Sequence, residues 1–284
     1  MPRIEPVQIR PHEWVFGAFL AWMLVRLAWH AGPLSPLTLG AAGLLGLNVA
    51  LIEMGRRSAQ AGWDRARLLF YPAAINVVFP AMGPAVRACG TAPADEWLQV
   101  TDAALFGGNL SLRLEAATAP WLTEVLSGCY LLFFPYLLLS VLWYGLGSLP
   151  TARRCYAGLF VIYGVGFAGY AILPAAGPWI AMRDEFIVPL RGWWLTPLND
   201  GIVRAGTNGV DVFPSLHAAV SAYLLWFDFR HKRWRFWSYL VPCVGLWVST
   251  VYLRYHYAVD LLAGFTLAAV GAQVALRLRA RQEA

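Results

Sequence analysis

Charged residues are scarce in this chain, and lysine is almost absent. Asp, Glu, Lys and Arg together make up 13% of the 284 residues, whereas apolar residues make up 59%. That balance excludes an ordinary soluble globular protein, and long apolar runs recur from end to end, which is typical of a polytopic membrane protein. The net charge of +6 is better explained by arginines held at one membrane face than by binding to nucleic acid, which is not an expected partner.

The chain also lacks the residue patterns of a metal centre. Its four cysteines show neither metal-ligand spacing nor a disulfide framework: Cys89, Cys129, Cys155 and Cys243. The five histidines are scattered, and no cluster of carboxylates accompanies them on one side. We therefore expect no metal and no cofactor.

Eight apolar runs of about 17 or more residues predict an all-α, polytopic helical bundle. They lie near 14–30, 36–55, 67–88, 120–147, 155–175, 212–229, 236–253 and 258–277. The segment Trp97–Leu112 is too short and too mixed in polarity to cross, so we expect it at the membrane surface. We divide the chain into residues 1–66, an N-terminal cytoplasmic segment with two accessory helices, and residues 67–284, a six-helix core.

Arginine distribution predicts the orientation. Every alternate connection is rich in arginine, which places those connections and both termini in the cytoplasm. The expected location is the plasma (inner) membrane. The outward connection 177–211 combines tryptophans with arginines, as suits the headgroup layer. It is compatible with a lid or platform at a lipid access route, and equally with an ordinary interfacial loop.

Two short stretches carry the expected chemistry. In the first, Pro214 and Ser215 precede His217 at the start of an apolar run. Proline is favoured in the opening turn of a helix, and the N–H groups of that turn can bind an anion. In the second, Asp260 follows His256 by four residues, on the same helical face, where a carboxylate can hold the imidazole in one tautomer.

The two histidines are predicted to share one face of the membrane. Two crossings separate them, and the arginine distribution makes that face the outer one. A neutral imidazole is a competent nucleophile, and a second imidazole can protonate a leaving oxygen. Arg254 is the nearest cation in sequence, and Ser215 with adjoining N–H groups could supply further phosphate contacts. The pattern predicts phosphoryl transfer.

These stretches resemble a known family. Phe213–His217 and Tyr252–Asp260 are similar to the motifs of the type 2 phosphatidic acid phosphatase superfamily. Their residue pattern most resembles that of its inositol phosphorylceramide synthase-like branch. The resemblance implies a six-helix phosphatase-type core and a metal-independent reaction. It also implies that His256 attacks phosphorus and forms a phosphohistidine, that Asp260 supports it, and that His217 protonates the leaving alcohol.

The chain departs from the family pattern in its phosphate-binding motifs. The usual lysine, six residues, then Arg-Pro is missing, and Ser249-Thr250 stands where the family has Ser-Arg. Arg254 is the expected substitute. The stretch Leu173–Pro178 resembles a proline-rich segment of the synthase-like branch, and Arg183 follows it closely. The expected phosphate-binding set is therefore Arg254, Ser215 and Arg183.

Taken together, the sequence predicts a membrane enzyme that hydrolyses a lipid phosphate ester, with water as the default acceptor. Transfer of a phospho-head group to a lipid alcohol is the alternative within the same chemistry. Phosphatidic acid, polyprenyl phosphates and phosphoinositol lipids all fit as substrates, and membrane lipids are the expected surroundings; the sequence identifies no protein partner. A lipid or solute transporter is the rival class, and it would require inverted repeats that the sequence does not show.

Overall fold

The computed structural model describes residues 9–58 and 60–283, and its regular elements there are helical. Residues 1–8, which belong to the predicted N-terminal cytoplasmic segment, lie outside the described residues. The helices are α1 (Pro11–His30), α2 (Pro36–Arg57), α3 (Ala61–Ala88), α4 (Asp95–Phe106), α5 (Leu110–Leu114), α6 (Pro120–Leu131), α7 (Phe133–Leu146), α8 (Leu149–Ile172), α9 (Pro178–Ala181), α10 (Leu195–Gly206), α11 (Leu216–His231), α12 (Arg233–Tyr252) and α13 (Ala258–Glu283). Two 3₁₀ turns, η1 (Glu115–Ala117) and η2 (Arg183–Glu185), complete the set. The all-α prediction is confirmed.

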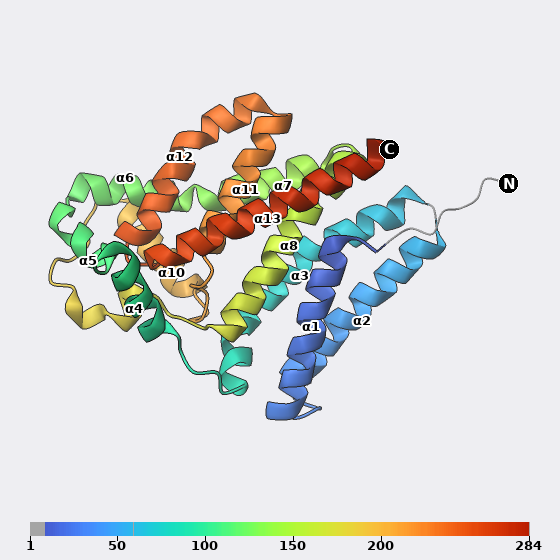
Figure 1. Ribbon diagram of the computed structural model, residues 1–284, viewed down its shortest axis with the longest axis horizontal. Helices are drawn as coiled ribbons and strands as arrows, with labels where there is room; N and C mark the ends of the chain where they lie inside the picture. The colour runs from blue at the N-terminus through green and yellow to red at the C-terminus, as the bar shows by residue number, and fades with distance from the viewer. Residues whose placement is uncertain (1–8, 59, 284) are drawn as a thin grey trace.

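Each of the eight predicted spans coincides with helical structure. The spans correspond to α1, α2, α3, the pair α6–α7, α8, α11, α12 and α13. In the part of the chain that is described, five stretches are long and apolar enough to cross a membrane by length and composition: α2, α3, α6–α7, α8 and α13. The protein is therefore an integral membrane protein built as a helical bundle (Figure 1).

The predicted span 120–147 is interrupted. Helix α6 ends at Leu131 and α7 begins at Phe133, with Leu132 between them. Pro135 explains the break, because proline has no N–H to donate to the carbonyl of Leu131 and its ring crowds that carbonyl. The two halves of this crossing can thus face different neighbours.

Helix α8 lies at the centre of the bundle. It packs against α1, α3, α7, α11 and α13, and most of its length is buried (Figure 1). Small residues allow the close approach of α13, since a Cβ added to Gly271 would lie 3.0 Å from the carbonyl oxygen of Gly158. This contact fixes α13, whose first turn carries Asp260, against the core.

The N-terminal helices are tied to the core by buried charges. Arg67 of α3 donates to Glu13 of α1 through Nε at 2.9 Å and Nη2 at 2.7 Å, and both side chains are fully buried. Nearby, Asp64 is bonded to both Arg10 and Arg153. Helix α3 begins at Ala61, slightly before the predicted boundary at residue 67. The division into accessory helices and core stays a proposal.

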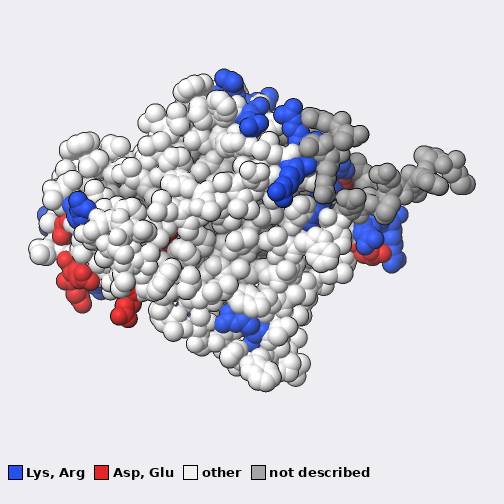
Figure 2. Space-filling view, viewed as in Figure 1, with Lys and Arg blue, Asp and Glu red and all other residues white. Residues whose placement is uncertain are grey.

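The two ends of the bundle differ in charge and in structure. The short helices α4, α5 and α10 lie at the end where α13 begins (Figure 1). Most of the Lys and Arg atoms visible in Figure 2 lie toward the other end, around the α11–α12 turn and the last turns of α13. Trp97–Leu112, predicted to stay at the surface, forms α4 and part of α5, and neither is long enough to cross.

Candidate active site

The start of α11 brings Ser215 and His217 to the end of the bundle where α13 begins. Ser215 is the residue that caps the helix, and its side chain accepts a hydrogen bond from the N–H of Ala218 at 3.3 Å. Pro214 precedes the cap instead of occupying the opening turn, so the helix begins two residues later than the proline. His217 is the second helical residue, beside N–H groups that have no partner within the helix.

A tight turn after α12 returns the chain to α11. Arg254 has a φ of 68°, in the left-handed region that non-glycine residues rarely adopt. The N–H groups of Tyr255 and His256 both donate to the carbonyl of Thr250 at 2.9 Å. The N–H of Ser215 in turn donates to the carbonyl of Asp260 at 3.1 Å. The starts of α11 and α13 are therefore joined through the main chain.

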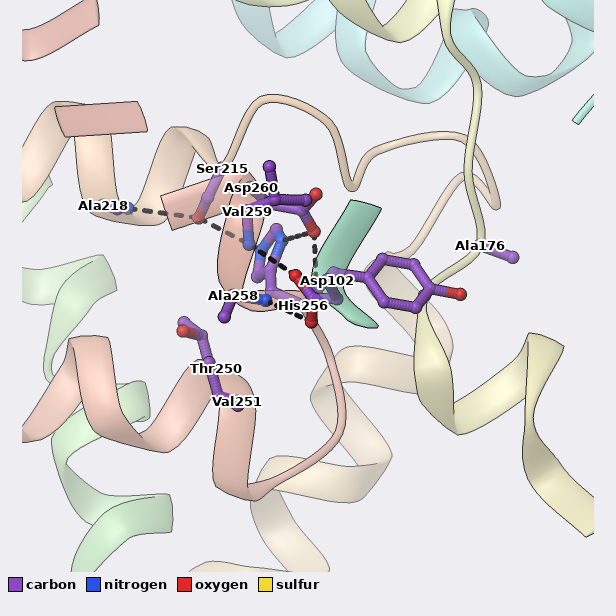
Figure 3. A network of polar contacts seen from close by, with 12 residues as sticks. Asp102, Ala176, Ser215, Ala218, Thr250, Val251, His256, Ala258, Val259 and Asp260 are labelled. Carbon is purple, nitrogen blue, oxygen red and sulfur yellow. Dashed lines mark hydrogen bonds and ion pairs between the residues drawn. The ribbon is translucent and has the colours of Figure 1, made fainter. Parts of the chain in front are cut away.

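The residues predicted to be catalytic lie together. The ring centroids of His217 and His256 are 5.7 Å apart. On one side of the His256 ring, Nδ1 lies 3.3 Å from Oδ2 of Asp260; on the other, Nε2 lies 3.3 Å from Oγ of Ser215 (Figure 3). Asp260 Oδ2 also accepts the N–H of Tyr257 at 2.8 Å, which fixes the carboxylate. The remaining nitrogen, Nε2, faces the first turn of α11.

Burial favours the neutral form of His256. Its side chain is 3% exposed, and loss of water lowers its pKa to about 4, although the nearby Asp211 carboxylate acts in the opposite direction. Asp211 lies in the connection before α11, where burial raises its own pKa. At neutral pH His256 is therefore an uncharged imidazole with a lone pair.

Aromatic rings enclose His217. The ring centroids of Tyr130 and Phe133 lie 4.8 Å and 4.6 Å from the His217 centroid, and Phe134 lies at 6.5 Å. These residues flank the break between α6 and α7. Sequence analysis did not single out these residues, because aromatic residues are common throughout the chain. The enclosure leaves His217 with an apolar wall on the side of α6 and α7.

Two carboxylates that sequence reasoning did not select hold the start of α13. Asp102 of α4 accepts the N–H groups of Ala258 and Val259 at 3.0 Å and 2.8 Å. Asp95, at the start of α4, accepts the hydroxyl of Tyr257 at 3.0 Å. Figure 3 shows Asp102 beside Ala258 and Val259, joined to them by dashed lines. In the sequence, both residues are acidic and lie in a segment predicted to be outside the membrane. That position alone predicts only that their side chains are exposed to water.

Replacing Asp102 by Asn should slow the enzyme by misplacing His256. The amide offers one acceptor oxygen for two N–H groups, and losing a hydrogen bond to a charged group costs about 1.5–3 kcal/mol. We expect turnover to fall roughly 10-fold with little change in KM, since substrate contacts remain. Glu96→Gln, at an exposed position six residues earlier on α4, is the matched control. Equal thermal midpoints with unequal turnover would support positioning, whereas a loss of stability alone would contradict it.

Of the predicted phosphate-binding residues, Ser215 contacts His256 directly. Arg254 and Arg183 line a cavity of about 660 Å³ that Tyr255 also borders, and their role in phosphate binding stays a prediction. Arg254 donates to Glu115 at 3.3 Å and to the carbonyl of Val188 at 2.6 Å. Its guanidinium is thus already paired. Burial lowers the pKa of Arg254 but leaves it charged at neutral pH.

The stretches that depart from the expected motifs have structural roles here. The hydroxyls of Ser249 and Thr250 donate to carbonyls one turn earlier in α12, those of Leu246 and Trp247. In the proline-rich stretch, the N–H groups of Ala176 and Gly177 donate to the Asp95 carboxylate. This stretch therefore anchors α4 beside the turn that carries His256.

The donor set around the site was also compared with that of a metal centre. Within residues 9–58 and 60–283, no group of three or more His, Cys, Asp or Glu side chains is arranged to hold a metal ion. The expectation that no metal takes part in the reaction stays a prediction.

Comparison with known proteins gives two matches and one negative result. The chain matches the PAP2 superfamily over residues 96–274, which includes α4 to most of α13. It is similar to a phosphoinositol dihydroceramide synthase of Bacteroides thetaiotaomicron, with 33% identity over 125 residues, or 38% of this chain and 40% of the relative. The chain thus spans well under two thirds of that relative, and no solved structure matches it. These findings confirm the resemblance seen in the histidine motifs: the chain belongs to the PAP2 superfamily, whose members include lipid phosphatases and phosphotransferases.

Proposed function

We propose that the protein cleaves the phosphoester bond of a membrane lipid through a phosphohistidine formed on His256. One observation carries this proposal: Nε2 of His256 faces the start of α11 while Asp260 engages Nδ1, with the His217 ring 5.7 Å away. A nucleophile, its orienting carboxylate and a second imidazole thus converge on one helix N-terminus.

In the first step, the lone pair of Nε2 attacks phosphorus and the bond to the leaving lipid oxygen breaks. The negative charge of the bound phosphate favours the protonated form of His217, which gives its proton to that oxygen, so a neutral alcohol departs. Asp260 stabilises the positive charge that develops on His256. Ser215 Oγ and the N–H groups of the first turn of α11 contact the phosphoryl oxygens, where negative charge accumulates.

In the second step, an acceptor hydroxyl attacks the phosphohistidine. His217, now neutral, takes the proton of that hydroxyl as the P–N bond breaks, and both imidazoles return to their starting states. Water as acceptor gives hydrolysis, and a lipid alcohol gives transfer. The enzyme needs no external reductant, oxidant or nucleotide in either case.

We place the reaction at the extracytoplasmic face. The arginine-rich connections belong inside by their charge, and the start of α13 lies at the other end of the bundle (Figures 1 and 2). By the same charge rule we propose that both chain ends lie in the cytoplasm and that the membrane is the plasma membrane.

A lipid alcohol is favoured as the second acceptor by the surroundings of His217. Tyr130, Phe133 and Phe134 form an apolar wall that suits an acyl chain and limits the access of water. The similarity to a phosphoinositol dihydroceramide synthase points in the same direction. Hydrolysis then becomes a slower competing reaction.

Purified protein in mixed micelles tests both outcomes. A panel of lipid phosphates and phosphodiesters is incubated with and without a long-chain lipid alcohol, and water-soluble phosphate products and new phospholipid are measured. Formation of new phospholipid supports transfer, and release of phosphate or phospho-head group without it supports hydrolysis. Product in detergent micelles excludes a transporter, which has no gradient to use there; absence of both products from every lipid would contradict the proposal.

The lowered pKa of His256 predicts that the reaction rate stays high at pH values well below 6.5. Because burial lowers this pKa to about 4, the imidazole stays neutral as pH falls through its ordinary value of 6.5. The rate of the first step should hold down to about pH 5 and fall only below that, as the proton finally binds Nε2. The check is the single-turnover rate against pH with an activated aryl phosphoester, with circular dichroism confirming folding at each pH. A half-maximal rate near pH 6.5 would contradict it.

A further inference from the structure

The cavity beside the catalytic turn has more positive charge than its own side chains neutralise. Four arginines line it, Arg183, Arg191, Arg204 and Arg254, together with one carboxylate, Asp200. Arg204 is paired with Asp200 at 2.8 Å, and Arg254 with Glu115 at 3.3 Å. Arg183 and Arg191 make no ion pair with any described residue. Two guanidinium groups at the wall of one cavity are thus available for an anion.

A buried amide oxygen in the same cavity also lacks a partner. Asn199 of α10 is 1% exposed and lines the cavity. Its Nδ2 donates to the hydroxyl of Tyr255 at 3.0 Å, whereas Oδ1 accepts no hydrogen bond from the described part of the chain. A buried acceptor without a donor is costly, so a ligand hydroxyl is the expected partner. The hydroxyls of Ser127 and Thr196 and the rings of Trp179 and Tyr255 complete the lining.

The cavity is built on a fixed support. Glu124 of α6 accepts the N–H groups of Trp193, Trp194 and Leu195 at 2.7 Å each and that of Thr196 at 3.1 Å. These bonds hold the start of α10, which carries Asn199, Asp200 and Arg204. A volume of about 660 Å³ lies within the range of small-molecule sites. Preformed walls reduce the ordering cost of binding.

The residues proposed to react with phosphorus do not line this cavity. Neither Ser215, His217 nor His256 lines the cavity, and Tyr255, whose backbone directly precedes His256, forms the wall nearest to them. Tyr130 contacts both the Tyr255 ring, at 4.9 Å between centroids, and the His217 ring. A head group attached to the reacting phosphorus would enter the cavity past Tyr255.

We propose that this cavity holds the head group of the lipid substrate, and that the head group bears hydroxyls and an anionic group of its own, as in a phosphorylated polyol. This inference rests on the proposed function, since it treats the cavity as the head-group side of a phosphodiester whose lipid side meets His217. Arg183 and Arg191 bind the second anion, and Asn199 Oδ1 accepts a ring or chain hydroxyl. A phosphate ester free in solution has the same chemistry, so the test separates the two sources.

Calorimetry on the detergent-purified protein provides the test, with myo-inositol 4-phosphate as the probe, because its phosphate is not the one that reacts. Arg183→Ala and Arg191→Ala should each weaken binding at least about 10-fold, because each removes a charge-assisted contact. Arg113→Ala is the matched control: it removes an exposed arginine of the outward connection that does not line the cavity. Equal weakening by Arg113→Ala, or none by the cavity variants, would overturn the site. Inorganic phosphate binding as tightly as the probe would overturn the hydroxyl contact.

Two further arms identify the source of the ligand and separate this inference from the catalytic proposal. Phosphatidylinositol 4-phosphate in mixed micelles should displace the soluble probe more effectively than phosphatidylinositol. Failure of both lipids to displace it would overturn the assignment to a lipid head group. His256→Ala should bind the probe as the wild type does. If His256→Ala still turned over lipid while the cavity variants lost the probe, the catalytic proposal would fail and the anion site would stand.

Discussion

Replacing His256 by Ala should lower turnover by at least about 10⁴-fold, because it removes the proposed nucleophile. His256 is the imidazole whose Nδ1 faces Asp260 and whose Nε2 faces Ser215. The loss should be independent of the leaving group, since attack itself is removed. The measurement is product formation from lipid in mixed micelles and from an activated aryl phosphoester, each relative to wild type.

Covalent labelling makes this result specific. Wild-type protein quenched during turnover of a ³²P-labelled substrate should carry label that is stable to base and lost in acid, as a phosphohistidine is, and His256→Ala should carry none. His30→Ala, which replaces an exposed histidine at the end of α1, is the control and should label normally. Full labelling of His256→Ala would mean that another residue is the nucleophile.

Replacing His217 by Ala should have an effect that depends on the leaving group. A lipid alkoxide is a strong base and needs a proton as it departs, so the loss with a lipid substrate should be about 10²–10⁴-fold. A 4-nitrophenolate leaving group is a far weaker base, and its first-step rate should fall less than about 10-fold. The second step still lacks its general base, so we expect a burst of one nitrophenolate per enzyme followed by slow turnover.

Pre-steady-state absorbance of nitrophenolate separates the two steps. His256→Ala should show no burst, whereas His217→Ala should show a nearly full burst and a slow second phase. If the first-step rate fell equally with both leaving groups, His217 would not be the proton donor. Its role would then be structural, in packing against Tyr130 and Phe133.

The proximity of the three candidate catalytic residues could be predicted from sequence because their geometry is local. His256 and Asp260 are four residues apart, and a single helical turn places them on one face, whereas His217 follows a capping residue at the start of a helix. Counting the crossings between the two motifs then places them on the same face of the membrane. The helical bundle was equally accessible, because a membrane demands long apolar runs, and five such stretches of the described chain are long and apolar enough to cross.

The parts that sequence reasoning missed depend on contacts between distant segments. Asp102 lies more than 150 positions before the N–H groups it binds, in a segment whose charges predict only exposure. Arg254 was expected at the reacting phosphate, but the left-handed turn at that residue and the Glu115 carboxylate hold its guanidinium at the wall of the cavity. The break at Leu132 had a local signal in Pro135, although the apolar run across it hid the interruption.

The main-chain bond from Ser215 N–H to the Asp260 carbonyl has a practical consequence for crystallography and cryo-electron microscopy. Neither partner atom belongs to a side chain. Variants that change the side chain of His217, His256 or Asp260 should therefore keep the starts of α11 and α13 at the same separation. Such inactive proteins should hold an intact lipid in its bound position long enough to be imaged. Density for the bound lipid would then show directly which of its chemical groups contact the cavity and which contact the aromatic residues around His217.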